Sequence, residues 1–424
     1  MFLEASVTHM MTGVLALGDV AEGDAMLSAC EPYLLEGDPL AVAEVIGMAG
    51  HASVWIERWE RARRVLDHLV ESARRASAVR ALIYPLAARA HLDFRMGRWA
   101  TARAEAAESV ELALDTGQLP LLSHSLAALA RVEAAMGQEE DARRHVREGL
   151  ELVTRFQGEA IAAYLHAALG ALELALGRVP EAIAALEASE RTVQRIEVQP
   201  AIIQAAPDLV EAYVRAGRRE DAAAALASFE AGAERTGSLW ARAAAARCHG
   251  LLAPDVDFRA RFDAALKLHD DLPMPFERGR TLLALGERLR RAKQRAQARP
   301  PLQEALDAFE RLGARPWAER ARGAAGDGPG LGAARGDRRR AADPARAADR
   351  AARRPGHDQP RGGGGAVPQP EDGRVPPRPD RPQARCPRPR AARLASRAAA
   401  TRPRSPATTP ASRRSAAARV AARR

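Results

Sequence analysis

Cysteine and aromatic residues are scarce in this chain of 424 residues. The three cysteines, Cys30, Cys248 and Cys386, lie far apart and form no C-x-x-C pair. This excludes a secreted scaffold held by disulfides and gives no indication of a zinc site. Aromatic residues make up only 4% of the chain, which disfavours an all-β protein, because sheets favour aromatic and β-branched side chains.

A secretory signal and a membrane-spanning run are also missing from the sequence. The mildly apolar stretch 10–17 follows Glu4 and has no basic region before it. No apolar run approaches the length that a membrane span needs. We therefore expect a cytoplasmic protein that does not contact a membrane.

Positive charge is confined to one end of the chain. The formal net charge is +10, yet residues 325–424 hold 24 arginines, no lysine and 8 acidic residues, which leaves residues 1–324 with a net charge of −6. The basic character therefore belongs to the C-terminal part. It gives no support to nucleic-acid binding by the rest of the chain.

Glycine recurs at a constant interval in the middle of the sequence. The segments MGRWATA, MGQEEDA, LGRVPEA and AGRREDA contain Gly97, Gly137, Gly177 and Gly217. An alanine stands five positions after each glycine: Ala102, Ala142, Ala182 and Ala222. Seven positions before each glycine stands a mostly small residue: Ala90, Ala130, Gly170 and Val210.

This pattern predicts a repeated helix–turn–helix unit. An apolar helix precedes each glycine, as in 122–136, and a helix with an apolar stripe follows it. Glycine can take the left-handed conformation that ends the first helix, because it has no Cβ. The alanine, one turn into the second helix, lets the two backbones approach each other.

The turn glycine, the alanine and the small residue together resemble the tetratricopeptide repeat, over roughly residues 40–322. The interval between successive glycines exceeds the usual period of ~34 residues, so we expect longer helices. The resemblance implies an all-α superhelical solenoid of helix pairs over residues 1–322. It also implies a concave face that binds a protein partner or a small inducer, without a cofactor.

Residues 276–322, from FERGRTLLALGERLRR to RPWAERAR, resemble the closing repeats of MalT-like regulators of the LuxR family. In that family this segment runs into a C-terminal helix-turn-helix, so the resemblance implies transcription regulation. Such regulators usually begin with a P-loop ATPase, but no G-x-x-x-x-G-K-[ST] occurs here. The chain therefore looks like a fragment of a regulator.

Residues 323–424 are rich in Arg, Ala, Pro and Gly, and aromatic residues are absent from residue 325 onward. Such a segment buries too little apolar surface to fold, so we expect a disordered tail. Codons read one base downstream can turn residues 342–350 into LTPHELQIA, 357–378 into TTNREVAAALFLSPKTVEFHLA and 379–387 into RIDRKLGVR. These strings resemble the LuxR-type helix-turn-helix, so we interpret the tail as that domain read out of frame. DNA binding through it is absent as written.

Several residues could suggest chemistry but have simpler interpretations. His124, His145 and His166 are evenly spaced, but no acid or cysteine keeps the same register, so we expect packed or surface histidines rather than a metal site. Acidic residues at 139–141 and 220–221 suit helix N-termini. The five tryptophans are expected to pack the repeats, and the arginine-rich stretch 288–299 is expected to be a solvated helix face.

We find no nucleophile with a histidine partner in a recognisable motif, so the sequence favours a sensor or interaction module over an enzyme. Two alternatives stay open. One is a stand-alone repeat scaffold with a basic disordered tail, and the other is non-specific nucleic-acid binding through the charge of that tail.

Overall fold

The computed structural model describes residues 13, 18–36 and 38–326. The chain divides into two compact units, residues 1–352 and 353–424, and all the described residues belong to the first. The predicted tail is therefore described only as far as residue 326. The segment interpreted as a frameshifted helix-turn-helix, 342–387, lies outside the described residues.

The regular structure of the described residues is entirely helical. In chain order the helices are α2 (Val20–Glu36), α3 (Ala43–Trp55), α4 (Trp59–Arg75), α5 (Val79–Arg95), α6 (Trp99–Asp115), α7 (Leu119–Met136), α8 (Glu139–Phe156), α9 (Glu159–Ala175), α10 (Val179–Arg195), α11 (Pro200–Ile203), α12 (Ala206–Ala216), α13 (Arg219–Thr236), α14 (Leu239–Leu252), α15 (Phe258–His269), α16 (Pro275–Arg291), α17 (Arg295–Leu312) and α18 (Arg315–Ala325).

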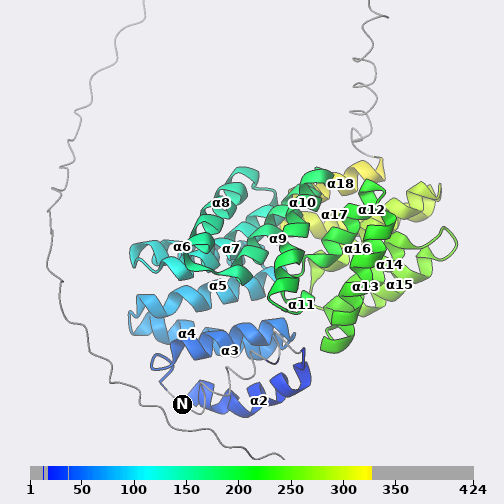
Figure 1. The fold of residues 1–424 in the computed structure, drawn as a ribbon. Coiled ribbons are helices and arrows are strands. Elements are labelled where there is room, and N and C mark those ends of the chain that lie inside the picture. Colours follow the sequence, from blue (N-terminus) through cyan, green and yellow to red (C-terminus); the bar gives the residue numbers. More distant parts are fainter. Residues whose placement is uncertain (1–12, 14–17, 37, 327–424) are drawn as a thin grey trace, which may run out of the picture. The chain divides into compact units, whose positions relative to one another are not determined.

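Most helices pack on the next through a short turn, and the first helices of neighbouring pairs also pack on each other, as α3 does on α5 and α5 on α7. Figure 1 shows these pairs following one another from α3 to α18. The predicted all-α superhelical solenoid of tetratricopeptide-like pairs is confirmed. None of the described helices is both long and apolar enough to cross a membrane.

The turns between helices follow a stricter register than the sequence pattern revealed. Residues with positive φ recur twice per repeat at equal intervals: Glu57, Ser77, Gly97, Gly117, Gly137, Gln157, Gly177, Glu197, Gly217 and Gly237. Each repeat therefore consists of two helix-plus-turn segments of equal length. Gly97, Gly137, Gly177 and Gly217 occupy the turns within pairs, with φ between +75° and +79°.

Small residues allow the two helices of a pair to approach each other closely. Ala102, Ala142, Ala182 and Ala222 are all at most 1% exposed. A Cβ added to Gly170 would lie 2.4 Å from the Cγ of Leu186. Gly50 and Gly286 occupy the same position, seven before a turn residue, and an added Cβ would likewise collide with Leu66 or Leu302.

The superhelix closes on itself within the first unit. The Glu57 carboxylate, in the turn between α3 and α4, accepts hydrogen bonds from the backbone N–H groups of Leu239 at 3.0 Å and Trp240 at 3.1 Å. On the other side, a Cβ added to Gly97 would lie 2.5 Å from Pro275 Cγ, and one added to Gly137 would lie 2.4 Å from Pro316 Cγ. The turns of the early pairs thus pack on α14, α16 and α18.

An aromatic cluster occupies this junction. Trp99 and Phe276 have ring centroids 5.0 Å apart, and those of Phe276 and Trp317 are 5.7 Å apart. Trp99, Trp240 and Trp317 are almost completely buried, in agreement with a packing role.

The arginine-rich stretch 288–299 is mostly exposed, as expected of a solvated face, but it is not one helix. Helix α16 ends at Arg291, and Lys293 takes a positive φ of 63° in the turn before α17. The interval from Lys293 to the next turn residue, Gly313, is the same as between the turns of the earlier helices.

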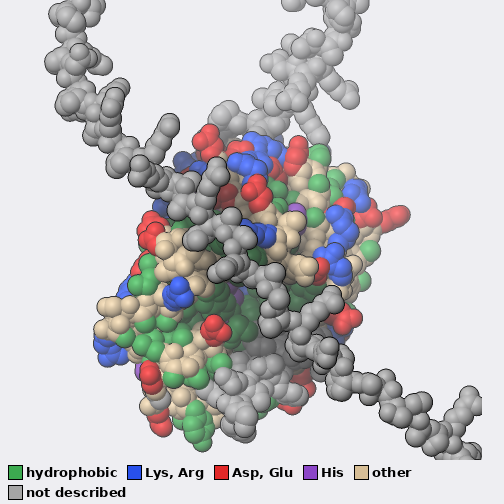
Figure 2. All heavy atoms as spheres, turned by 60° about the vertical axis from the view of Figure 1, so that its left-hand side comes forward, with side chains coloured by type: hydrophobic (Ala, Val, Ile, Leu, Met, Phe, Trp, Pro, Cys, Tyr) green, Lys and Arg blue, Asp and Glu red, His purple; other side chains and the backbone are tan. Residues whose placement is uncertain are grey.

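On the face shown in Figure 2, basic and acidic side chains are interspersed rather than segregated.

Candidate functional site

The first helices of the early pairs carry polar side chains into the interior of the superhelix in the repeat register. Tyr84, His124 and Tyr164 are separated by one repeat period each, on α5, α7 and α9, and so are His51, His91 and Arg131 on α3, α5 and α7. Equivalent positions of stacked helices lie side by side. A separation of one period therefore brings these side chains together.

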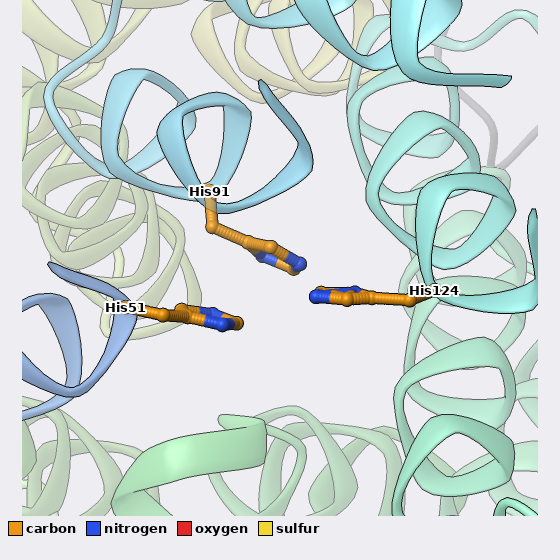
Figure 3. A group of neighbouring side chains, drawn as sticks. All are labelled: His51, His91 and His124. Carbon is orange, nitrogen blue, oxygen red and sulfur yellow. The ribbon is translucent and has the colours of Figure 1, made fainter. Parts of the chain in front are cut away.

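Three histidines from different helices converge in this interior. The rings of His51, His91 and His124 point toward one another (Figure 3), and one nitrogen from each lies within 4.8 Å of the others. The ring centroid of His51 lies 5.2 Å from that of His91 and 5.4 Å from that of His124, with interplanar angles of 24° and 13°.

The protein leaves two of these imidazoles only partly satisfied. His51 Nδ1 lies 3.0 Å from the hydroxyl of Tyr84, but the Nε2 atoms of His51 and His91 are buried and have no hydrogen-bond partner among the described residues. Burial is the main cause that lowers the pKa of His51 and His91 well below 6.5, with Arg95 contributing in both cases. Burial also lowers the pKa of His124 to about 4. The cluster is therefore uncharged at neutral pH.

Two buried arginines lie beside the histidines. Arg95 donates to the carbonyl oxygens of Val54 and Ile202, both at the long distance of 3.4 Å. Arg131 donates to Gln204 Oε1 and lies over the ring of Phe94. Neither guanidinium forms an ion pair with any of the described carboxylates, and burial lowers the pKa of Arg95 to about 10. Both remain cationic at neutral pH.

A large pocket leads to this region. Its volume is about 860 Å³, and it opens at the junction of α3, α4, α13 and α14, with Trp55, Glu57 and Ile202 in its wall. Trp55 contacts the His51 ring, with centroids 4.4 Å apart, and Ile202 accepts from Arg95. A second cavity of about 50 Å³ is lined by Arg131, Tyr164 and Gln204 among others. The large pocket therefore borders the cluster through Trp55 and Ile202, and the small cavity borders it through Arg131, while Arg95 and the three histidines line neither.

The arginines of the later pairs have different surroundings. Arg280 and Arg320 both bind Glu211, at 2.7 Å and 2.6 Å, and Arg320 also binds Glu287 at 2.7 Å. Arg247 binds Glu277 at 2.7 Å. These buried ion pairs join α12, α14, α16 and α18 and stabilise the fold. The contrast singles out Arg95 and Arg131, which have no such carboxylate among the described residues.

The three evenly spaced histidines singled out in the sequence are not brought together as one group. His145 Nδ1 lies 2.7 Å from Glu133 Oε2, and His166 is a half-buried residue of α9, while His124 joins the interior cluster. His51 and His91 were missed, although their separation by one repeat period was a usable signal. The acidic residues 139–141 and 220–221 lie in the first turns of α8 and α13, as expected.

This fold defines the chain as a tetratricopeptide-like helical repeat protein, with a pocket of ligand size beside its buried histidines and arginines. No family model matches the chain, and no curated protein sequence matches it. Among solved structures, it is similar to a Rap protein complexed with Competence and Sporulation Factor, with a TM-score of 0.60 and 14% identity over 73% of this chain and 87% of that one. At this identity the likeness shows a shared fold alone.

Two further solved structures have TM-scores below 0.5. They are the apo form of RapI, with a TM-score of 0.49 and 11% identity over 64% of this chain and 98% of that one, and aspartyl phosphate phosphatase F from Bacillus subtilis, with a TM-score of 0.41 and 12% identity over 78% and 96%.

Proposed function

We propose that this chain is a sensor module that binds an effector with an anionic group at Arg95 and Arg131 inside the superhelix, either a small inducer or a segment of a protein partner. The observation that carries the proposal is the burial of Arg95 and Arg131 without an ion pair to any described carboxylate; Glu57, Glu277 and Asp208 act on them only from beyond ion-pair distance. A buried charge without a partner destabilises a protein. A carboxylate or phosphate that pairs with these guanidinium groups would offset that penalty and bind tightly.

The size of the pocket beside these arginines supports this role. A volume of about 860 Å³ lies within the range of small-ligand sites, which runs from roughly 300 to 1,000 Å³. The Rap protein of similar fold was solved in complex with Competence and Sporulation Factor, so a superhelix of this kind is compatible with a bound signalling molecule. The absence of catalysis remains a prediction.

A thermal-shift experiment tests the proposal on the full chain. The probes are a set of organic acids and short peptides with either free or amidated C-termini. We expect carboxylates to raise the melting temperature, while their amides do not. The rise disappears in Arg95→Gln and Arg131→Gln. Arg74→Gln, which alters a half-exposed arginine paired with Glu108, serves as the matched control and keeps the response. A response that persists in both interior variants, or the failure of every carboxylate, contradicts the proposal.

The regulator to which this sensor belongs is inferred from the sequence alone. The resemblance of residues 276–322 to MalT-like proteins, and the helix-turn-helix readable in the shifted frame, support a cytoplasmic LuxR-family transcriptional regulator without an intact DNA-binding domain. The nucleotide sequence across codons 320–390 tests this part. Stop codons in the shifted frame, or middle bases that break the apolar pattern of the helices, would contradict the proposal of a frameshifted helix-turn-helix.

Binding by the basic tail is the competing explanation for any contact with nucleic acid. A gel-shift comparison of the chain with and without residues 325–424 distinguishes binding by the tail from binding by the rest of the chain. We expect that any binding depends on the tail and weakens with salt.

A further inference from the structure

We propose that His51, His91 and His124 form a binding site for a single transition-metal ion such as Zn²⁺, with a fourth position left open. The three residues come from α3, α5 and α7, the first helices of three consecutive pairs. Because the ligands stand on packed helices rather than on loops, the site is held by the repeat framework itself.

The geometry is close to that of a three-histidine centre. A ligand nitrogen lies about 2.0–2.1 Å from Zn²⁺, so nitrogens in a tetrahedral site are roughly 3.3 Å apart. The present separations reach 4.8 Å, so metal binding requires the imidazole rings to move until their nitrogens are about 1.5 Å closer together. Figure 3 shows the three rings directed at a common centre from separate ribbons.

The donor atoms are available for a metal. The Nε2 atoms of His51 and His91 are buried without a hydrogen-bond partner in the described part of the chain, which is unfavourable unless another group satisfies them. The Tyr84 hydroxyl contacts Nδ1 of His51 at 3.0 Å. Metal-bound histidines commonly have their second nitrogen held in this way, which fixes the tautomer and the ring orientation.

The donor atoms select the type of ion. Arg95 and Arg131 are the cationic side chains that act on His91, while Trp55, Tyr84 and Tyr164 surround the cluster with uncharged rings. These two charges repel any cation, so the type of ion is selected by the donor atoms and not by the charges. Neutral imidazoles favour Zn²⁺, Cu²⁺ or Ni²⁺, and the positive surroundings favour an anion in the open position.

The simpler interpretation is that the three imidazoles only pack against one another. Their nearly parallel stacking is compatible with this, but stacking alone leaves the two buried Nε2 atoms without partners. Metal binding accounts for the missing partners, which packing of the rings alone does not. The two interpretations differ in what the protein does with added metal.

The test uses the full chain, first treated with EDTA and then titrated with Co²⁺ and Zn²⁺. We expect one ion per chain by calorimetry and the intense visible absorption of tetrahedral Co²⁺, which Zn²⁺ displaces. His91→Gln and His124→Gln are expected to lower the affinity at least tenfold and to abolish the absorption. His145→Gln, which removes a histidine paired with Glu133, is the matched control and leaves both unchanged.

A second variant guards against misfolding of the histidine variants. Tyr84→Phe removes only the hydroxyl beside His51, and it is expected to lower metal affinity by about 10- to 100-fold while the helical circular dichroism spectrum is unchanged. Absence of stoichiometric binding overturns the proposal. So does binding that the interior variants do not weaken, since it would come from surface histidines. None of these readouts depends on an effector, so their failure leaves the proposed sensor role standing.

Discussion

Single residues in this protein have roles that depend on their partners more than on their type. Arg280 is buried between carboxylates, and it forms part of a network that stabilises the later helix pairs. Arg95 is equally buried, but it donates to the carbonyl oxygens of Val54 and Ile202. The first arginine is satisfied by ion pairs within the fold. The second has no ion pair with any of the described carboxylates.

The burial of His124 predicts how low pH changes the free energy of unfolding. His124 has a pKa of about 4 in the folded state and about 6.5 when exposed. Between these values the unfolded chain binds more protons, so the free energy of unfolding falls as the pH drops from 6.5 to 4 and is fully retained above 6.5. We expect His124→Gln to reduce this fall by up to about 3 kcal/mol.

Urea denaturation at several pH values, with EDTA present to exclude metal effects, measures this change. After allowance for any constant packing difference, wild-type and variant curves should coincide below about pH 4, diverge between pH 4 and 6.5, and keep a constant separation above pH 6.5. Parallel curves throughout the range would show that His124 does not contribute to the acid sensitivity.

At the level of elements, half of the repeat framework was predictable from sequence. Gly97, Gly137, Gly177 and Gly217 mark turns because glycine is the residue best suited to positive φ. The intervening turns at Ser77, Gln157 and Glu197 take the same conformation with side chains that carry no such preference. The tertiary packing of the helices therefore imposes that geometry, and a search for glycines cannot find it.

Two of the turn glycines, Gly137 and Gly217, form a matched pair for measuring how much the packing of an early turn on a later helix stabilises the protein. Gly137 and Gly217 have φ values of +75° and +79°, but an added Cβ meets Pro316 at Gly137 and open space at Gly217. We expect Gly217→Ala to destabilise the protein by about 1 kcal/mol through backbone strain. Gly137→Ala should lower the free energy of unfolding by a further ~1–3 kcal/mol, because the added Cβ collides with Pro316.

Chemical denaturation of both variants gives the comparison directly. The difference between them reports the contact of the α7–α8 turn with α18, since the strain is common to both. Equal effects would mean that α18 moves away from the turn without loss of free energy.

For the whole molecule, the interior site was largely beyond sequence analysis. The separation of His51 and His91 by one repeat period is visible in the sequence, but the inward direction of their side chains depends on the rotation of each helix. Arg95 and Arg131 are of a type that usually lies at the surface. They are buried here because segments far along the chain, including Ile202 and Gln204, fold back over them.

The junction at Glu57 predicts a long-range effect of a single substitution. Glu57→Ala removes the carboxylate that accepts from Leu239 and Trp240 at the start of α14. We expect a loss of about 0.5–2 kcal/mol, as for other helix N-terminal caps. Amide hydrogen exchange should become faster at Leu239 and Trp240, although the mutated residue lies in a distant turn.

Glu60→Ala, which changes an exposed acidic residue three positions further along, is the control and should leave exchange in α14 unchanged. If both variants behave alike, the contact between the α3–α4 turn and α14 does not stabilise the protein in solution.

Open repeat arrays behave as one-dimensional stacks, in which each unit responds only to its neighbours and the ends can fray independently. The hydrogen bonds from α14 to Glu57, and the packing of the Gly137 turn on α18, connect units that are far apart in that stack. A change that loosens or tightens one pair therefore also acts on the pair across these contacts. Such a loop can carry a signal around its circumference without the hinge that a two-domain receptor requires.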